Sequence, residues 1–476
     1  MTQQAPDYST TTPQRGGVLG VAARTLSTRD GCRRMVIFIG LATFALAAWH
    51  AGQTYFRSDE WAYWTVRRDF LEAGGLKNLG HFFFSPHGGS IPAGIVAIWL
   101  PLDWIFGMHW YLPYAIPSMA LHVLGGFALF ELLVRHLWPA VALGASALFL
   151  IMGNAASGIA YGWMVGYIAA LSAGFVALYV MERIGGKNDR LVVGTTLAAV
   201  LVAIAFTGVG LAIVVMVSAA YALRGRVRLA LLHVAVVAVP FIGWRLFYKP
   251  PAIELRIDEI GTHLSFMWNG FITAAGDLVA IPWLGAVVVA AAVGGAGWSW
   301  RERGDLWVVN VATLVGAVFF YGLVAVRAVD LRAHSFSYDQ DRYLYIAAAL
   351  LIPSIAWLVS RLISVRSWVA APMVLLMLWA VPLNVLQAMD SYDTLVELGQ
   401  TNRVTVETAA SLVGHLDPLE AGFLVADRSA RFTVEQFERL DEQGKVPCVA
   451  DLDLAVTFAQ RQGMPAPTAG QVSCGR

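Results

Sequence analysis

The chain has 476 residues, of which 58% are hydrophobic and 14% are charged, and its formal net charge is +1. A typical soluble chain is about 45–50% apolar and about 25% charged. The excess lies in blocks such as 191–222 and 368–385, which contain no formally charged residue. This pattern predicts an integral membrane protein with several spans and excludes an ordinary water-soluble fold. The small net charge gives no indication of nucleic-acid binding.

The first apolar run begins only after Arg33 and Arg34, behind a polar lead. We therefore expect residues 1–34 to be a disordered cytoplasmic lead rather than a signal peptide, followed by an uncleaved first span. Including this first span, eleven apolar segments have the composition of membrane spans. We expect an all-α membrane domain with spans near 35–54, 111–134, 138–153, 158–181, 191–206, 208–223, 228–248, 272–298, 306–326, 342–360 and 367–389.

A further apolar stretch, 91–107, decides the topology. It contains Pro92, Pro101 and Asp103 and is about 17 residues long, the lower limit for crossing a bilayer. Counting it as a span would place every later basic cluster outside, against the positive-inside rule. We therefore predict an interfacial or re-entrant helix there, in an eleven-span chain whose N-terminus is inside. The clusters that this topology places in the cytoplasm are Arg33-Arg34, Arg135, Arg183/Lys187/Arg190, Arg224/Arg226/Arg228, Arg301/Arg303 and Arg361/Arg366.

The same topology places residues 390–476 outside the cytoplasm. They hold 13 Asp or Glu and seven Lys or Arg, a net charge of −6. A short strand within 422–426 and a helix within 433–443 predict a small soluble α/β domain. Cys448 and Cys474 both lie in this tail, and a disulfide and two free thiols are both open from the sequence. The expected location is the plasma (inner) membrane, with the C-terminal domain extracytoplasmic.

Two adjacent carboxylates, Asp59 and Glu60, follow the first predicted span among several aromatic residues. One interpretation is that they occupy the first turn of a helix capped by Ser58, which for Glu60 is the better explanation. For Asp59, a partly desolvated carboxylate beside a loop rich in His and Gly suits general-base catalysis. We assign both as candidate catalytic residues, and nearby Tyr63 to the substrate cavity.

The loop 80–90 contains His81, His87 and several glycines. Glycines let the backbone approach a ligand closely, and His87 is placed to donate to a phosphate oxygen. The alternative is a turn anchored to the membrane surface by Phe82–Phe84, which suits His81 better, although His81 remains a candidate for the substrate cavity. The spacing of Asp59, His81 and His87 matches no standard metal signature, so no metal site is predicted.

A third group of polar residues precedes the predicted span 342–360. It combines arginines with tyrosines and aspartates, and Arg supplies permanently charged, planar donors that suit phosphate. We assign Arg342 and Arg327 as candidates for binding a phosphate, and Tyr345 to the substrate cavity. The alternative is ion pairing of Arg327 with Asp330, and of Arg342 with Asp339 or Asp341.

These features together resemble the GT-C superfamily of polyprenyl-phosphate-dependent membrane glycosyltransferases. Asp59-Glu60 resembles the acidic motif of that family, 85–89 with 91–107 resembles its loop and juxtamembrane helices, and Arg342-Tyr343 resembles its late Arg-Tyr pair. The resemblance covers most of 35–389. This chain has Pro86-His87-Gly88-Gly89 at the position where several members of the family have a loop rich in Lys or Pro.

The resemblance implies inverting transfer of a sugar from a polyprenyl-phosphate donor to a hydroxyl of a cell-envelope glycan or protein, on the outer face. Asp59 would take the proton of the acceptor, and Arg342, with Arg327 or His87, would stabilise the departing lipid phosphate. Membrane lipid and the lipid-linked donor are the expected partners. The sequence indicates no certain cofactor, and a divalent cation stays open. The alternatives are a flippase or transporter of lipid-linked sugars, and an assembly protein without catalysis.

Overall fold

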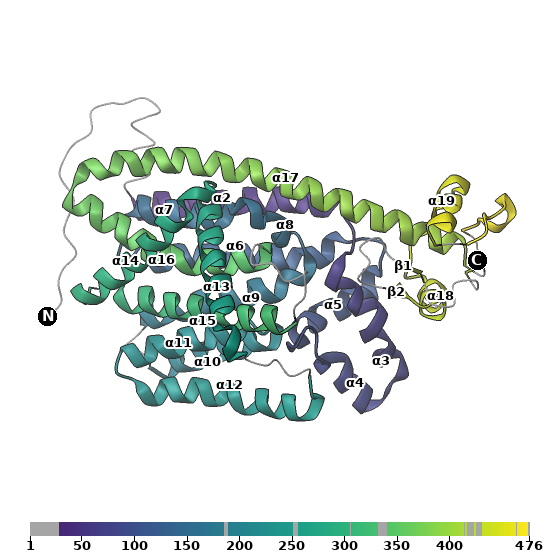
Figure 1. Cartoon of the computed structure of the whole chain (residues 1–476), viewed down its shortest axis with the longest axis horizontal. Coiled ribbons are helices and arrows are strands. Elements are labelled where there is room, and N and C mark those ends of the chain that lie inside the picture. The colour runs from purple at the N-terminus through teal and green to yellow at the C-terminus, as the bar shows by residue number, and fades with distance from the viewer. Residues whose placement is uncertain are drawn as a thin grey trace.

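The computed structural model describes residues 28–184, 189–250, 256–304, 306–331, 340–413, 415–416, 423–424, 431–462 and 464–474. Most of the long helices lie side by side and form a bundle, while short helices and the C-terminal segment gather at one end of it (Figure 1). We call this the loop end of the bundle. Of the predicted disordered lead 1–34, residues 1–27 lie outside the described residues. Residues 29–34 are not disordered as predicted, because α2 begins at Arg29.

Nine helices in the described part of the chain are long and apolar enough to cross a membrane. They belong to α2 (Arg29–Ala51), α6 (Leu112–Leu133), α9 (Val165–Ile184), α10 (Asp189–Phe206), α12 (Val227–Tyr248), α14 (Gly285–Glu302), α15 (Trp307–Leu331), α16 (Asp341–Val365) and α17 (Ala370–Ser411). Two more apolar helices, α7 (Pro139–Ile151) and α11 (Gly210–Leu223), have 13 and 14 residues. The all-helical membrane architecture is confirmed, whereas the count of eleven spans stays a prediction that requires α7 and α11 to cross as well.

The predicted continuous span 272–298 is wrong, because two helices replace it. Helix α13 (Ile260–Leu278) ends before a break, and α14 begins at Gly285. Pro282 lies in the short helix η6 (Pro282–Leu284) and has no N–H to continue a helical ladder, and Ala280 has a φ of 55°. Hydropathy alone cannot register this break, because the residues on both sides of it are apolar.

Basic residues predicted to share one side of the membrane do lie together, at the end of the bundle opposite the loop end. Arg33 on α2 pairs with Glu131 on α6 over 2.5 Å, and Arg361 on α16 pairs with Glu302 on α14 over 2.8 Å. Each pair joins residues far apart in the sequence. Its formation requires the helix ends to meet as the alternating topology predicts.

The loop end is built largely from residues 52–111. The short helix η1 (Ser58–Glu60) is followed by the π-helical turn η2 (Tyr63–Arg67), α3 (Arg68–Ala73), α4 (Gly75–Phe84) and α5 (Ala93–Phe106). Helix α5 has 14 residues, as many as α11, so its length alone does not separate it from a span. It lies at the loop end beside α4 (Figure 1), and the assignment of 91–107 to an interfacial or re-entrant helix stays a prediction.

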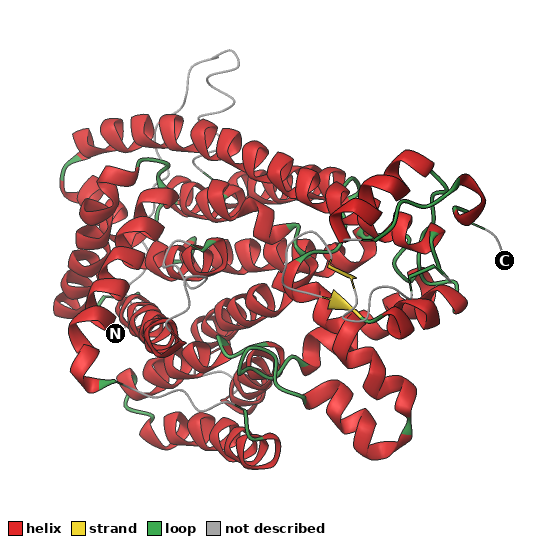
Figure 2. Ribbon diagram, turned by 45° about the vertical axis from the view of Figure 1, so that its right-hand side comes forward, coloured by secondary structure: helices red, strands yellow, loops and turns green. Residues whose placement is uncertain are grey.

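The C-terminal segment continues from the bundle without a boundary at the predicted position. Helix α17 runs unbroken through residue 390, where the soluble domain was expected to begin. Beyond it lie β1 (Phe423–Leu424), β2 (Arg431–Phe432), α18 (Val434–Glu442) and α19 (Leu452–Gln462), and Cys448 forms a disulfide with Cys474. The two strands of two residues each are antiparallel (Figure 2), and they are too short to make the described residues an α/β domain.

Several short helices connect the bundle. They are η3 (Gly153–Ala155), α8 (Ala156–Ile159), η4 (Gly162–Met164), η5 (Ile257–Glu259), η7 (Ser367–Val369) and η8 (Ala469–Gln471). Asn384 on α17 is fully buried beside two of these irregular regions. Its Oδ1 accepts from the N–H of Gly153 over 2.8 Å, and its Nδ2 donates to the carbonyl of Leu278 over 3.3 Å. One side chain thus satisfies backbone groups at the ends of α7 and α13, where a bilayer offers no water.

Replacing Asn384 with Leu is expected to destabilise the fold. The change leaves the N–H of Gly153 and the carbonyl of Leu278 without this buried partner, at a cost of about 1–3 kcal/mol for each group. The thermal unfolding midpoint of the purified protein in detergent measures the effect. Leu386→Ala on the exposed side of α17 is the matched control, and equal midpoints for both variants would contradict the bridging role of Asn384.

Candidate active site

A cavity of about 110 Å³ lies at the loop end, between the 52–111 segment and the ends of α9, α10, α15 and α16. Its polar lining consists of Asp59, His87, Ser90, Thr207, Arg327 and Arg342, with Tyr167 and Tyr343 beside them. Apolar walls come from Ile95, Trp163 and Phe206. Four of the residues selected from the sequence, Asp59, His87, Arg327 and Arg342, therefore meet in one place although they come from three separate parts of the chain.

Asp59 lies in η1 between two basic side chains. Its Oδ2 accepts from Nη1 of Arg342 over 3.0 Å, and its Oδ1 is 3.5 Å from Nε2 of His87. Burial opposes ionisation of Asp59, but its hydrogen bond and charge interaction with His87, together with Arg342, outweigh this and lower the pKa of Asp59 to about 2. The side chain is still 35% exposed. Asp59 is thus a carboxylate at neutral pH and remains accessible from the cavity.

A tight turn presents His87 to the cavity. His87 and Ser90 exchange backbone hydrogen bonds of 3.0 and 2.9 Å, and Gly88 and Gly89 between them have φ values of 52° and 76°. Positive φ at both central positions is the geometry of a type I′ turn, which Gly adopts without strain. Arg327 of α15 donates a hydrogen bond to the carbonyl of Gly88. Gly88 also leaves room for the arginine, because a Cβ there would meet Nη2 of Arg327 at 3.0 Å.

Two arginines enter the cavity from neighbouring helices. Arg342 lies in the first turn of α16, where its Nε donates to Gln340 over 3.0 Å and its guanidinium stands 5.2 Å from the ring centre of Tyr343. Arg327 lies near the end of α15. Against these cations the described cavity lining has one carboxylate, Asp59, so the lining carries a net positive charge and suits an anion.

Glu60 has a different environment from its neighbour. It is fully buried, and its carboxyl group accepts from the hydroxyl of Tyr111 over 2.8 Å and from the N–H groups of Arg57 and Trp163 over 2.8 and 3.2 Å. It does not belong to the cavity lining. Its contacts tie η1 to Tyr111, just before α6, and to η4, which is a structural role. The expected capping by Ser58 differs from the structure, because η1 begins at Ser58 with Arg57 as its N-cap, and Glu60 itself accepts from the N–H of Arg57.

The three residues assigned to the substrate cavity from the sequence lie elsewhere. Tyr63 is buried and donates to Asp103 over 3.4 Å, His81 packs between the rings of Phe70 and Tyr248, and the hydroxyl of Tyr345 lies 3.0 Å from Nδ1 of His122 inside the bundle. None of these three side chains lines the cavity, although each is close in the sequence to a residue that does. The alternative ion pairs with Asp330, Asp339 and Asp341 stay predictions, because the structure describes neither residue 339 nor the side chains of Asp330 and Asp341.

Sequence reasoning missed Trp163, Tyr167 and Thr207. Trp163 lies in η4 and packs its ring against His87, with ring centres 4.9 Å apart. Trp163 and Tyr167 lie inside the predicted span 158–181, and Thr207 lies between two predicted spans, so nothing in the sequence sets them apart from ordinary membrane residues. Only the break between α8 and α9, which Gly158 and Gly162 weakly indicate, could have drawn attention to Trp163.

Comparisons with solved structures identify the architecture. The chain matches ArnT from Cupriavidus metallidurans, in a structure bound to undecaprenyl phosphate, with a TM-score of 0.50 and 14% identity over 94% of this chain and 90% of that one. It also matches the Archaeoglobus fulgidus oligosaccharyltransferase, in complex with Zn and sulfate, with a TM-score of 0.50 and 14% identity over 84% of this chain and 58% of that one. The chain has the GT-C fold. No protein-family model and no curated protein matches the sequence.

The cavity residues that the structure describes do not fit a divalent cation. No group of three or more His, Cys, Asp or Glu side chains in the part of the chain that the structure describes is arranged to hold a metal ion. Asp59 and His87 are the ligand types present, and Asp59 is already paired with Arg342. Two arginines beside a single carboxylate repel a dication, whereas metal sites in proteins gather several anionic or neutral oxygen and nitrogen ligands.

The pH dependence of stability tests the buried state of Glu60 in this GT-C fold. Burial raises the pKa of Glu60 to about 8, against the opposing hydrogen bonds from Tyr111 and Arg57, while the unfolded value is about 4.3. The folded state therefore holds the proton that the unfolded state has lost, and Glu60 lowers stability as pH rises from about 4.3 towards 8, by up to about 1.4 kcal/mol per pH unit. Glu60→Gln keeps the shape without the titration.

We expect the unfolding midpoint of the wild-type chain to fall between pH 5 and pH 8 more steeply than that of Glu60→Gln. The difference between the two slopes isolates Glu60 from all other titrating groups. Parallel slopes would show that Glu60 is ionised at neutral pH in the folded state and that its three hydrogen-bond donors outweigh burial.

Proposed function

We propose that the protein is an inverting glycosyltransferase that moves a sugar from a polyprenyl-phosphate donor to an acceptor hydroxyl. The observation that carries the proposal is the convergence of Asp59, His87, Arg327 and Arg342 on one cavity at the loop end of a GT-C fold. One carboxylate beside two permanent cations matches the needs of a reaction in which a hydroxyl loses a proton and a phosphate departs.

Arg342 and Arg327 are the donor-phosphate ligands in this proposal. Guanidinium groups offer several N–H donors in a plane and stay charged at any physiological pH. The two residues lie near the ends of adjacent membrane helices, so a phosphate bound between them leaves its prenyl chain next to the apolar surface of the bundle. His87 stands on the same cavity and supplies a further donor to the phosphate.

Asp59 is the general base, but its resting pKa of about 2 makes it a weak one. An efficient base has a pKa closer to the working pH. The donor phosphate resolves this difficulty, because it competes with Asp59 for Arg342 and for His87. Once these partners turn to the phosphate, burial is left as the dominant influence on Asp59, and its pKa rises. Donor binding thereby activates the base before the acceptor reacts.

The chemical step is a single displacement. The acceptor oxygen attacks the anomeric carbon, its proton passes to the carboxylate of Asp59, and the bond from the anomeric carbon to the phosphate oxygen breaks. The lipid phosphate leaves with the electron pair and is stabilised by Arg342 and Arg327. Attack from the side opposite the leaving group inverts the anomeric configuration. Holding both substrates in line supplies much of the remaining rate.

The outer face of the plasma membrane is the proposed site of this reaction. The basic helix ends lie opposite the loop end, as the positive-inside rule requires for an outer cavity. The disulfide between Cys448 and Cys474 suits an oxidising compartment. With eleven spans, the C-terminal residues and the cavity are extracytoplasmic, and the acceptor is a hydroxyl of a cell-envelope glycan or protein.

Asp59→Asn is expected to abolish transfer while the protein still inserts and folds. The amide cannot accept the proton, and general-base catalysis contributes about 10²–10⁴-fold to rate. A radiolabelled polyprenyl-phosphate sugar, supplied to the purified protein in liposomes with membrane acceptors, measures the product. Asp390→Asn, at an exposed position on α17, is the matched control and should retain wild-type activity.

Full transfer by Asp59→Asn would contradict the mechanism. A flux assay in the same liposomes addresses the transporter alternative: movement of the lipid-linked sugar across the bilayer, without glycosidic product and unaffected by Asp59→Asn, would replace the enzyme by a flippase.

A further inference from the structure

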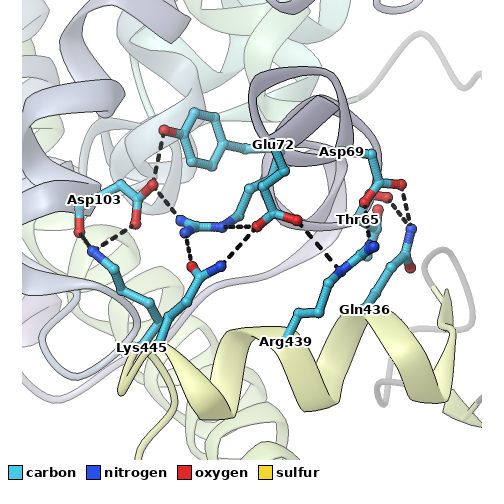
Figure 3. Close-up of polar contacts among 10 residues, drawn as sticks. Thr65, Asp69, Glu72, Asp103, Gln436, Arg439 and Lys445 are labelled. Atoms are coloured by element: carbon cyan, nitrogen blue, oxygen red, sulfur yellow. Dashed lines mark hydrogen bonds and ion pairs between the residues drawn. The ribbon is translucent and has the colours of Figure 1, made fainter. Parts of the chain in front are cut away.

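Residues of the C-terminal segment form hydrogen bonds and ion pairs with the 57–106 segment, which carries Asp59 and His87. Helix α18 lies against α3, and Figure 3 shows the polar side chains that join them. Nε2 of Gln436 donates to the carbonyl of Thr65 and to Oδ2 of Asp69, both over 2.7 Å. Arg439 donates to Oδ1 of Asp69 over 3.0 Å and pairs with Glu72 over 3.3 Å.

A second contact joins the turn after α18 to α5. Nζ of Lys445 donates to the carbonyl of Asp103 over 2.5 Å and lies 3.4 Å from its Oδ1 (Figure 3). Asp103 is 1% exposed and also pairs with Arg68 over 2.5 Å. The carbonyl of Lys445 accepts from the N–H of Met108 over 2.7 Å. A carboxylate at this depth requires its cationic partners, because an unpaired buried charge is strongly destabilising.

The outer half of α17 makes a third contact, just before Asp59. Asn402 donates to the carbonyl of Phe56 over 2.9 Å, and Thr54 donates to the carbonyl of Leu395 over 2.7 Å. Gly399 allows this approach, because a Cβ there would meet Oγ1 of Thr54 at 2.0 Å.

These contacts bracket the two cavity residues in the sequence. Asp59 lies between Phe56, held by α17, and Thr65, held by α18, while His87 lies between α4 and α5. Arg67 connects η2, which α18 holds at Thr65, to the end of α4, just before His87. Its guanidinium is buried and donates to the carbonyls of Phe82 and Ser85, each over 2.7 Å. Helices as short as α3 and α4 are unstable alone, so their positions depend on what packs against them.

We propose that Gln436, Arg439 and Lys445 are positioning residues, which hold the 57–106 segment so that Asp59 and His87 face the cavity. The proposal rests on the proposed glycosyl transfer for its catalytic consequence. It makes the C-terminal residues a fixed part of the active-site architecture, although none of them lines the cavity.

The test is the double variant Gln436→Ala/Arg439→Ala in the full chain. Alanine favours helix, so α18 is expected to persist while its grip on α3 is lost. We expect kcat to fall by about ten- to a hundredfold, the loss that small misplacement of reacting groups produces. The KM for the donor should change less than kcat, by a fewfold at most, because two of the three proposed phosphate ligands, Arg327 and Arg342, lie on α15 and α16 and only His87 lies on the loosened segment.

Arg461→Ala, which removes an exposed arginine from α19, is the matched control and should leave both constants unchanged. Lys445→Met provides an independent break at the second contact and should reproduce the loss of kcat. Equal unfolding midpoints for the wild type and the α18 variant would exclude general unfolding as the cause.

Hydrogen exchange separates this proposal from the transferase proposal. Amides within 57–72 and 85–92 should exchange faster in the α18 variant than in the wild type, whether or not the wild type transfers a sugar. Faster exchange with no transfer by the wild type would overturn the proposed function and support the positioning role. Unchanged exchange, or faster exchange with unchanged kcat in an active enzyme, would overturn the positioning role.

Discussion

The ion pair between Asp59 and Arg342 is the contact on which the candidate site depends. It joins a loop that follows the first membrane helix to the start of a helix 283 residues later, and it places the carboxylate where His87 also reaches it. Burial opposes ionisation of Asp59, but His87 and then Arg342 outweigh it and depress the pKa, so that in the proposed mechanism the resting carboxylate is a weak base. A bound phosphate can relax that state by competing for Arg342. The geometry of the site and the proposed mechanism thus both depend on the pair between Asp59 and Arg342, which a bound phosphate can replace.

Much of the site was predictable because charged residues in a membrane protein are few and costly to place. Asp59, His87, Arg327 and Arg342 stood out as polar residues at the ends of apolar segments, and the basic clusters placed those ends on one side. The same reasoning keeps 91–107 out of the predicted spans, and α5 lies at the loop end of the bundle (Figure 1). Periodicity and charge are visible in one sequence, and these conclusions needed nothing more.

The direction in which a side chain points was not predictable. Tyr63 and Tyr345 lie two to four residues from cavity residues, yet both are buried, Tyr63 against Asp103 and Tyr345 against His122. These partners lie on other helices, and a single sequence does not show which helices pack together. Trp163 and Thr207 escaped notice because nothing in their local sequence distinguishes them from ordinary residues at a helix end. The break between α13 and α14, and the contacts of Gln436 and Arg439 with α3, depend on tertiary packing, which pattern analysis does not contain.

A structure of the chain with a bound polyprenyl monophosphate tests the central claim most directly. The account predicts the phosphate in the cavity at the loop end, within hydrogen-bond distance of Arg342 and Arg327, about 2.7–3.2 Å. It also predicts that Arg342 has moved away from Asp59 and that the prenyl chain follows the apolar surface of the bundle. A phosphate bound outside this cavity, or one bound there with the pair between Asp59 and Arg342 intact, would contradict it.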